Sequence, residues 1–89
     1  MSNQEAVCGG WTPYHNLMPE EKEVFAKALA GFVGVNYMPN TVSTQVVEGK
    51  NYRYKCQASL PGSEGMWDAI VEIFQPLDSD PYIYGIIRI

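Results

Sequence analysis

The chain has 89 residues, of which 46% are hydrophobic, and a formal net charge of −4, so it has room for one small domain with one sheet and one helix. So short a chain seldom encloses a deep catalytic cleft, which favours a module that binds through surface loops over an enzyme. The acidic balance and the six scattered Lys and Arg residues argue against a nucleic-acid partner, because a phosphate backbone needs a basic surface.

Residues 1–10 carry no periodic pattern and end in Gly9-Gly10, which predicts a flexible N-terminal trunk on a single domain spanning residues 1–89. This stretch has neither the basic start nor the apolar core of a secretory signal, so we expect a cytoplasmic protein. No membrane contact is expected, because the apolar runs are far shorter than the about eighteen residues that a span requires.

The two cysteines, Cys8 and Cys56, are expected to be free thiols, because one falls in the trunk and the other on the apolar face of a predicted strand. A single His15 and unsuitable cysteine spacing make a metal site improbable, and no cofactor is expected.

After the trunk, Trp11, Thr12 and Tyr14 form either a short strand or an anchoring turn. An amphipathic helix is then predicted from about residue 16, for about fifteen residues, ending near Gly34. Its first turn tolerates Pro19 and carries acidic residues that suit the positive end of the helix dipole. The side chains expected to pack on a sheet are Phe25, Ala28, Leu29 and Phe32.

Four strands follow, over residues 41–47 (beginning as early as Tyr37), 51–59, 66–74 and 82–89. Residues 51–59 give the clearest pattern, since the apolar residues Tyr52, Tyr54, Cys56 and Ala58 alternate with polar ones. Glu48-Gly49 supplies a turn, because glycine adopts a positive φ at little cost. The third strand also carries Ile70 and Phe74 on its otherwise polar face, which suggests cover by chain curvature or by a second copy.

These elements predict an α+β fold in which a four- to five-stranded antiparallel sheet is wrapped around one α-helix. In a meander, alternate turns meet at the same end of the sheet. The apolar tip at Val46 and Val47 should therefore lie beside the turn at Pro76 and Leu77. Exposed apolar side chains at such a tip predict a contact site that a partner covers.

Two motifs give the chain a resemblance to the stefins, the type 1 class of the cystatin superfamily. The pentapeptide Gln45-Val46-Val47-Glu48-Gly49 matches the family's Gln-Val-Val-x-Gly loop, and Cys8-Gly9-Gly10-Trp11 matches its N-terminal trunk around a glycine. The resemblance covers most of residues 8–84 and implies a cystatin-like fold. It also implies reversible, tight-binding inhibition of papain-like, cathepsin-like cysteine peptidases.

In that family a trunk and two hairpin loops fill the active-site cleft of the peptidase. The resemblance therefore implies that the peptidase-binding residues are Val7, Cys8 and Gly9 in the trunk, Gln45, Val46, Val47, Glu48 and Gly49 in the first loop, and Pro76 and Leu77 in the second. The family usually has Leu-Pro in the second loop, and the order here is reversed.

Two other interpretations remain. In the first, the chain is a cystatin-fold binding or assembly module without a peptidase target, and it exists as a monomer or as a domain-swapped dimer. In the second, the chain is an enzyme with Cys8 as nucleophile and His15 as base. The enzyme is disfavoured because a thiol in a mobile trunk lacks a fixed partner. His15 is expected to be an exposed turn residue, and Asp78 and Asp80 to be turn formers rather than catalytic carboxylates.

Overall fold

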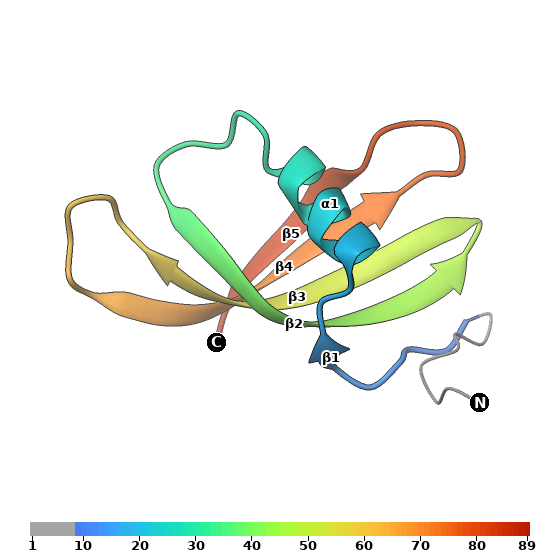
Figure 1. Cartoon of the computed structure of the whole chain (residues 1–89), viewed down its shortest axis with the longest axis horizontal. Helices are drawn as coiled ribbons and strands as arrows, with labels where there is room; N and C mark the ends of the chain where they lie inside the picture. Colours follow the sequence, from blue (N-terminus) through green and yellow to red (C-terminus); the bar gives the residue numbers. More distant parts are fainter. Residues whose placement is uncertain (1–8) are drawn as a thin grey trace.

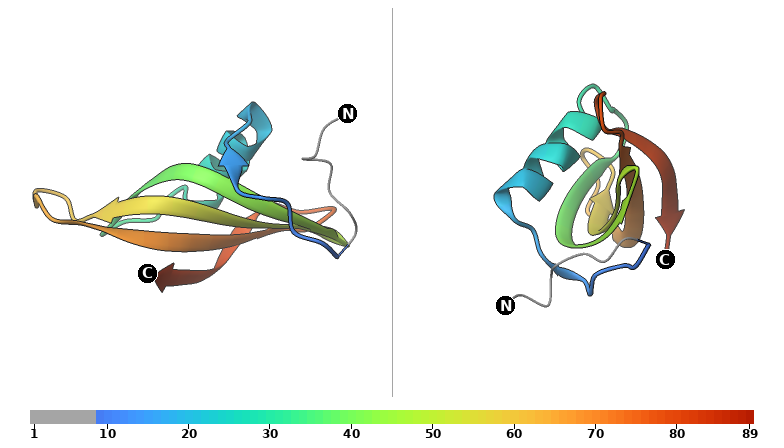
Figure 2. Two further views of the ribbon diagram at one scale, coloured as in Figure 1. Left: turned by 90° about the horizontal axis from the view of Figure 1, so that it is seen from below. Right: turned by 90° about the vertical axis from the view of Figure 1, so that its right-hand side faces the viewer.

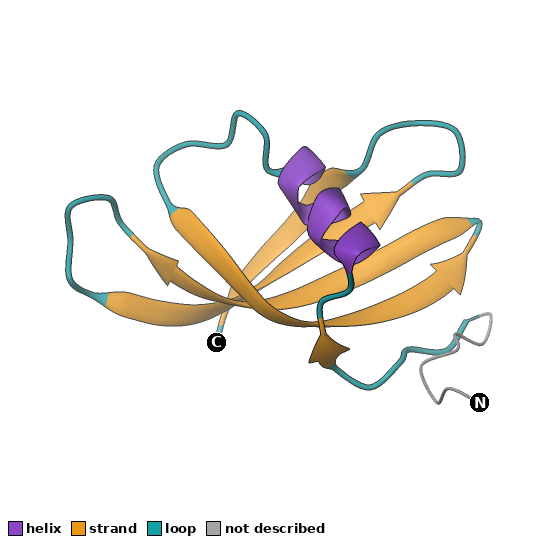
Figure 3. Ribbon diagram, in the orientation of Figure 1, coloured by secondary structure: helices purple, strands orange, loops and turns teal. Residues whose placement is uncertain are grey.

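The computed structural model describes residues 9–89. Its elements in chain order are β1 (His15–Asn16), α1 (Pro19–Ala28), β2 (Asn36–Val47), β3 (Gly49–Ser59), β4 (Met66–Gln75) and β5 (Tyr82–Arg88). The five strands form one antiparallel sheet in the order β1-β2-β3-β4-β5, and α1 lies across one of its faces (Figure 1, Figure 3). The sheet curves around the helix (Figure 2). This confirms the predicted α+β fold, in which an antiparallel sheet wraps around one α-helix.

The core lies between α1 and the concave face of the sheet. The apolar side chains of β3 are buried as their alternation predicted: Tyr52, Tyr54, Cys56 and Ala58. Tyr54 is fully buried, its ring centroid 4.8 Å from that of Phe25 and 5.7 Å from that of Tyr52. Burial raises the pKa of the Cys56 thiol to about 12, so this cysteine stays protonated and unreactive at neutral pH.

The helix begins later than the sequence pattern predicted. Asn16 belongs to β1, where it pairs with Thr41 of β2 and so takes an extended conformation. The first helical residue is Pro19, whose missing N–H costs nothing there. The Glu21 carboxylate accepts a hydrogen bond of 2.8 Å from the backbone N–H of Met18, which fixes this helix start.

The helix also ends earlier than predicted and has ten residues rather than about fifteen. After Leu29 the chain turns, and Gly31 takes a φ of +81° that a continuing helix cannot contain. Phe32 therefore leaves the helical stripe and is 42% exposed, its ring resting against Tyr37 at 5.8 Å. The prediction that Phe32 packs in the core is wrong, whereas Phe25 is buried and Leu29 packs against the core.

Strand β2 starts at Asn36, earlier than the pattern of β-branched residues suggested. Its first part contains Pro39, and β1 covers only Thr41 and Val42 of β2, so the proline lies on an unpaired edge where no N–H is needed. The pairing with β3 shifts register between Pro39 and Thr41.

The two apolar residues on the outer face of β4 have apolar cross-strand neighbours in β5. Ile70 pairs with Ile87, and Phe74 pairs with Tyr82 with ring centroids 5.9 Å apart. Each pair shields part of its own surface. Cover by a second copy stays a prediction.

No helix within residues 9–89 is long and apolar enough to cross a membrane. Over the described part of the chain, no three His, Cys, Asp or Glu residues are grouped so that they could hold a metal ion.

Candidate functional site

The tip of the β2–β3 hairpin depends on a glycine. Val47 pairs with Gly49 across a turn at Glu48, and Gly49 has a φ of +110°. A Cβ at Gly49 would lie 2.5 Å from the backbone oxygen of Gln75 and 3.0 Å from the ring of Phe74. Only glycine allows the tip to take this conformation and to rest directly against the end of β4.

The first and second predicted loops share one end of the sheet, as the meander predicted (Figure 1). They enclose an open groove of about 400 Å³ whose lining residues are Val46, Gly49, Lys50, Tyr52, Gln75, Pro76 and Leu77. Leu77 is 75% exposed, but Val46 and Val47 are half-buried. The prediction that Val46 and Val47 are exposed to solvent is therefore wrong, because neighbouring segments cover part of the tip.

One of those segments is the chain that leads into β1. The Gly9 N–H donates to the Val46 carbonyl at 2.9 Å, and Trp11 forms an antiparallel bridge with Gln45. The segment therefore runs along the edge of β2 up to the hairpin tip, at the same end as the β4–β5 connection (Figure 1, Figure 2). The predicted trunk residues Val7 and Cys8 lie outside the described residues.

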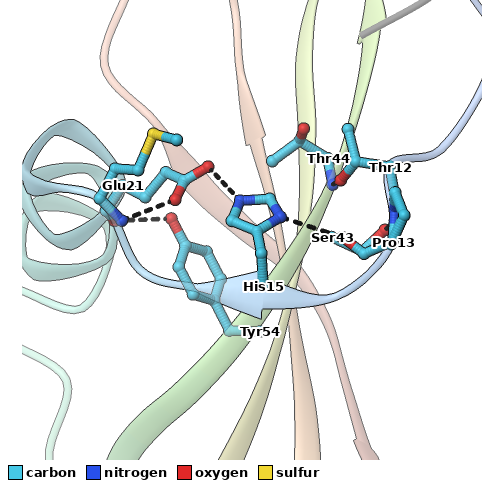
Figure 4. Close-up of polar contacts among 8 residues, drawn as sticks. Thr12, Pro13, His15, Glu21, Ser43, Thr44 and Tyr54 are labelled. Atoms are coloured by element: carbon cyan, nitrogen blue, oxygen red, sulfur yellow. Dashed lines mark hydrogen bonds and ion pairs between the residues drawn. The ribbon is translucent and has the colours of Figure 1, made fainter. Parts of the chain in front are cut away.

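Thr12 fastens this segment to β2 (Figure 4). Its N–H donates to the Thr44 carbonyl at 2.8 Å, and its hydroxyl oxygen accepts from the Thr44 N–H at 3.0 Å. The Ser43 hydroxyl donates to the Thr12 carbonyl at 2.5 Å. All three residues are buried. Of the two predicted alternatives, a short strand or an anchoring turn, the segment is closer to a short strand, because it is extended and pairs with β2. The sequence did not indicate the roles of Ser43 and Thr44, because serine and threonine are common in strands.

Aromatic side chains from the same segment stack on basic residues of β3. The Arg53 guanidinium lies 4.7 Å from the Trp11 ring centroid, and the Lys55 ammonium lies 4.2 Å from that of Tyr14. Arg53 also pairs with the Glu72 carboxylate at 3.2 Å. These cation–π contacts add modest stabilisation to the backbone pairing and hold the segment against the outer face.

His15 is not the exposed turn residue that the sequence suggested (Figure 4). Its side chain is 11% exposed, with Nε2 2.9 Å from a Glu21 carboxylate oxygen and Nδ1 2.9 Å from the Pro13 carbonyl oxygen. Both neighbours are acceptors, so the doubly protonated imidazolium satisfies both contacts. Partial burial and Lys50 lower the pKa of His15, but hydrogen bonds to Glu21 and Pro13 and the Glu21 charge outweigh them and raise it above its usual value.

This ion pair should make the folding stability depend on pH. Because the pKa of His15 is higher in the folded chain, its stabilisation is complete below the unfolded value of about 6.5 and is lost as pH rises through the folded value. His15 is the single histidine of the chain, so one NMR titration of its ring protons gives the folded pKa directly. The Glu21→Gln variant is the control and should lower this pKa; an equal pKa in both proteins would contradict the pairing.

Comparison with known proteins places the fold in a family. No protein-family model matches the sequence, and no curated protein matches it. A solved structure, a secreted type 1 cystatin from Fasciola hepatica, is similar over 91% of this chain and 96% of its own, with 31% sequence identity and a TM-score of 0.58. The five-stranded sheet and the single helix agree with that similarity. The chain therefore belongs to the cystatin family.

Proposed function

We propose that this protein is a reversible, tight-binding inhibitor of papain-like, cathepsin-like cysteine peptidases. One observation carries the proposal: Gly9, the hairpin tip at Val46 and Gly49, and the turn at Pro76 and Leu77 lie together at one end of the sheet. Membership of the cystatin family supports it, because the resemblance of the same segments to the family's trunk and two loops implies this activity.

The geometry suits a cleft that accepts an extended chain. The hairpin tip is short, and it is braced by Gln75 and by the segment at Gly9, so little conformational entropy is lost on docking. The exposed Leu77 and the half-buried Val46 offer apolar surface to such a cleft. An interface of standard size would bury about 1,600 Å² in total.

An enzymatic role has less support. The candidate base His15 has both ring nitrogens engaged, one by Glu21 and one by Pro13, so it has no nitrogen free to activate a nucleophile. Its proposed partner Cys8 lies outside the described residues. The buried Cys56 cannot replace it, since burial raises the pKa of its thiol to about 12.

Titration of papain with the purified protein tests the proposal. We expect stoichiometric loss of peptidase activity without cleavage of the added chain. Gel filtration of the same sample separates monomer, the form proposed to inhibit, from a domain-swapped dimer, in which the hairpin tip would be straightened. Full peptidase activity in the presence of excess monomer would reject the proposed function.

Replacing Val46 with aspartate should weaken inhibition by about 2 kcal/mol or more, equivalent to about 30-fold in the inhibition constant. The reason is that Val46 lines the groove between the two loops, where a carboxylate would have to be desolvated on docking. The measurement is the inhibition constant for papain from progress curves. Met66→Asp is the matched control, because Met66 is 63% exposed at the start of β4, the opposite end of the sheet. Equal inhibition by Val46→Asp and wild type would remove this tip from the mechanism.

A further inference from the structure

The side-chain amide of Gln45 bridges two segments at the hairpin tip. Its Nε2 donates to the Gly9 carbonyl oxygen at 3.0 Å, and its Oε1 accepts from Asn51 Nδ2 at 2.8 Å. The Gly9 carbonyl can only accept, so the NH₂ group of Gln45 must face it. The oxygen of Gln45 then faces Asn51, which must present its own NH₂ group. The chemistry of the three partners thus fixes both amide orientations.

Backbone pairing puts Gln45 at the centre of this arrangement. It lies opposite Asn51 of β3 on one side and bridges to Trp11 on the other. Gly9 is held at both of its peptide groups, since its N–H donates to Val46 and its carbonyl accepts from Gln45. A Cβ at Gly9 would meet nothing within 4 Å, so side-chain packing plays no part in holding this residue. Among the described residues, these two hydrogen bonds hold Gly9 beside the tip.

We propose that Gln45 is a positioning residue that clamps the trunk to the hairpin tip, and that it does not itself contact the peptidase. This inference rests on the proposed inhibitory function and divides the first loop into two roles. Val46 and Gly49 line the groove, whereas the Gln45 amide already has its oxygen and one N–H engaged inside the molecule. These two contacts orient the amide toward Gly9 and Asn51 inside the molecule, so we expect Gln45 to act by ordering Gly9 before docking.

A double-mutant cycle separates the two roles. The inhibition constant for papain is measured for wild type, for Gln45→Ala, for a chain lacking residues 1–9, and for the truncated chain with Gln45→Ala. We expect Gln45→Ala to weaken the full chain by about tenfold, as for one lost hydrogen bond, and to leave the truncated chain unchanged. An equal loss in both chains would show direct contact with the peptidase and overturn the inference. Gln57→Ala, an exposed glutamine on β3, is the matched control and should match wild type.

A readout without peptidase tests the clamp independently. NMR relaxation and amide exchange of Gly9 in the free protein should show a more mobile residue in Gln45→Ala than in wild type. Gln45→Glu should also free Gly9 at pH 7, where a carboxylate cannot donate, and restore its order below about pH 4, where the protonated acid can. If Gly9 behaves alike in all three proteins at both pH values, the clamp is rejected. If Gly9 loosens as expected but wild type fails to inhibit papain, the clamp stands and the proposed function fails.

Discussion

Replacing Tyr54 with alanine is expected to lower the free energy of unfolding by about 3–5 kcal/mol. Tyr54 is fully buried between Phe25 and Tyr52, and its hydroxyl donates to the Glu21 carbonyl oxygen at 2.8 Å. Removing the ring leaves a cavity where the helix crosses the sheet. The loss is a large share of the about 5–15 kcal/mol that stabilises a typical domain, so part of the population should unfold near 37 °C. Urea denaturation followed by circular dichroism measures the change.

The Tyr54→Phe variant is the matched control, because it keeps the ring and removes only the hydroxyl. Burial raises the pKa of Tyr54 well above its usual value, so the group remains a donor over the whole working range of pH. Its loss should cost about 1 kcal/mol. If the two variants were equally destabilised, the hydrogen bond to the helix rather than ring packing would dominate at this position.

Replacing Gly49 with alanine is expected to damage both stability and inhibition. The φ of +110° costs an L-residue about 1–3 kcal/mol, and the added Cβ would stand 2.5 Å from a backbone oxygen that cannot move alone. The tip must therefore separate from Gln75, which widens the groove that Val46 and Leu77 line. We expect papain inhibition to weaken by about tenfold or more. Urea denaturation and the inhibition constant measure the two effects.

Gly62→Ala separates backbone strain from the steric clash. Gly62 also has a positive φ, +78°, but a Cβ there would meet nothing within 4 Å, and the residue lies in the β3–β4 turn at the opposite end of the sheet. This variant should lose about 1–2 kcal/mol of stability and inhibit as wild type does. If Gly49→Ala were no more harmful than Gly62→Ala, the contact with Gln75 would be unimportant.

The sheet was predictable because its information is local. Alternation along residues 51–59 identifies Tyr54 and Cys56 as core residues, and Glu48-Gly49 identifies the turn. The helix limits were not predictable, because Asn16 pairs with Thr41 of β2 and Gly31 turns the chain after α1. Pairing with a distant strand overrides the local pattern, and hydrophobic spacing does not detect it.

For the candidate site too, some features were predictable from the sequence and others were not. The resemblance supplied the residues of the trunk and loops, and the meander placed the turns at Val46 and Leu77 together. The contacts that hold Gly9 and Thr12 in place join residues more than thirty positions apart, with no periodic spacing that would identify them. Gln45 lies near the end of β2, and the hydrogen bond from its side chain to Gly9 is visible only in three dimensions.

The pairing of the N-terminal segment with β2 also bears on solubility. The backbone of β2 between Thr44 and Val46 pairs with Gly9, Trp11 and Thr12. Without that pairing, this part of β2 would be an unpaired strand edge beside apolar side chains. Unpaired strand edges of this kind can pair with strands of other molecules and so start aggregation. Proteolytic trimming of this segment would thus expose a surface prone to fibril formation as well as shorten the trunk.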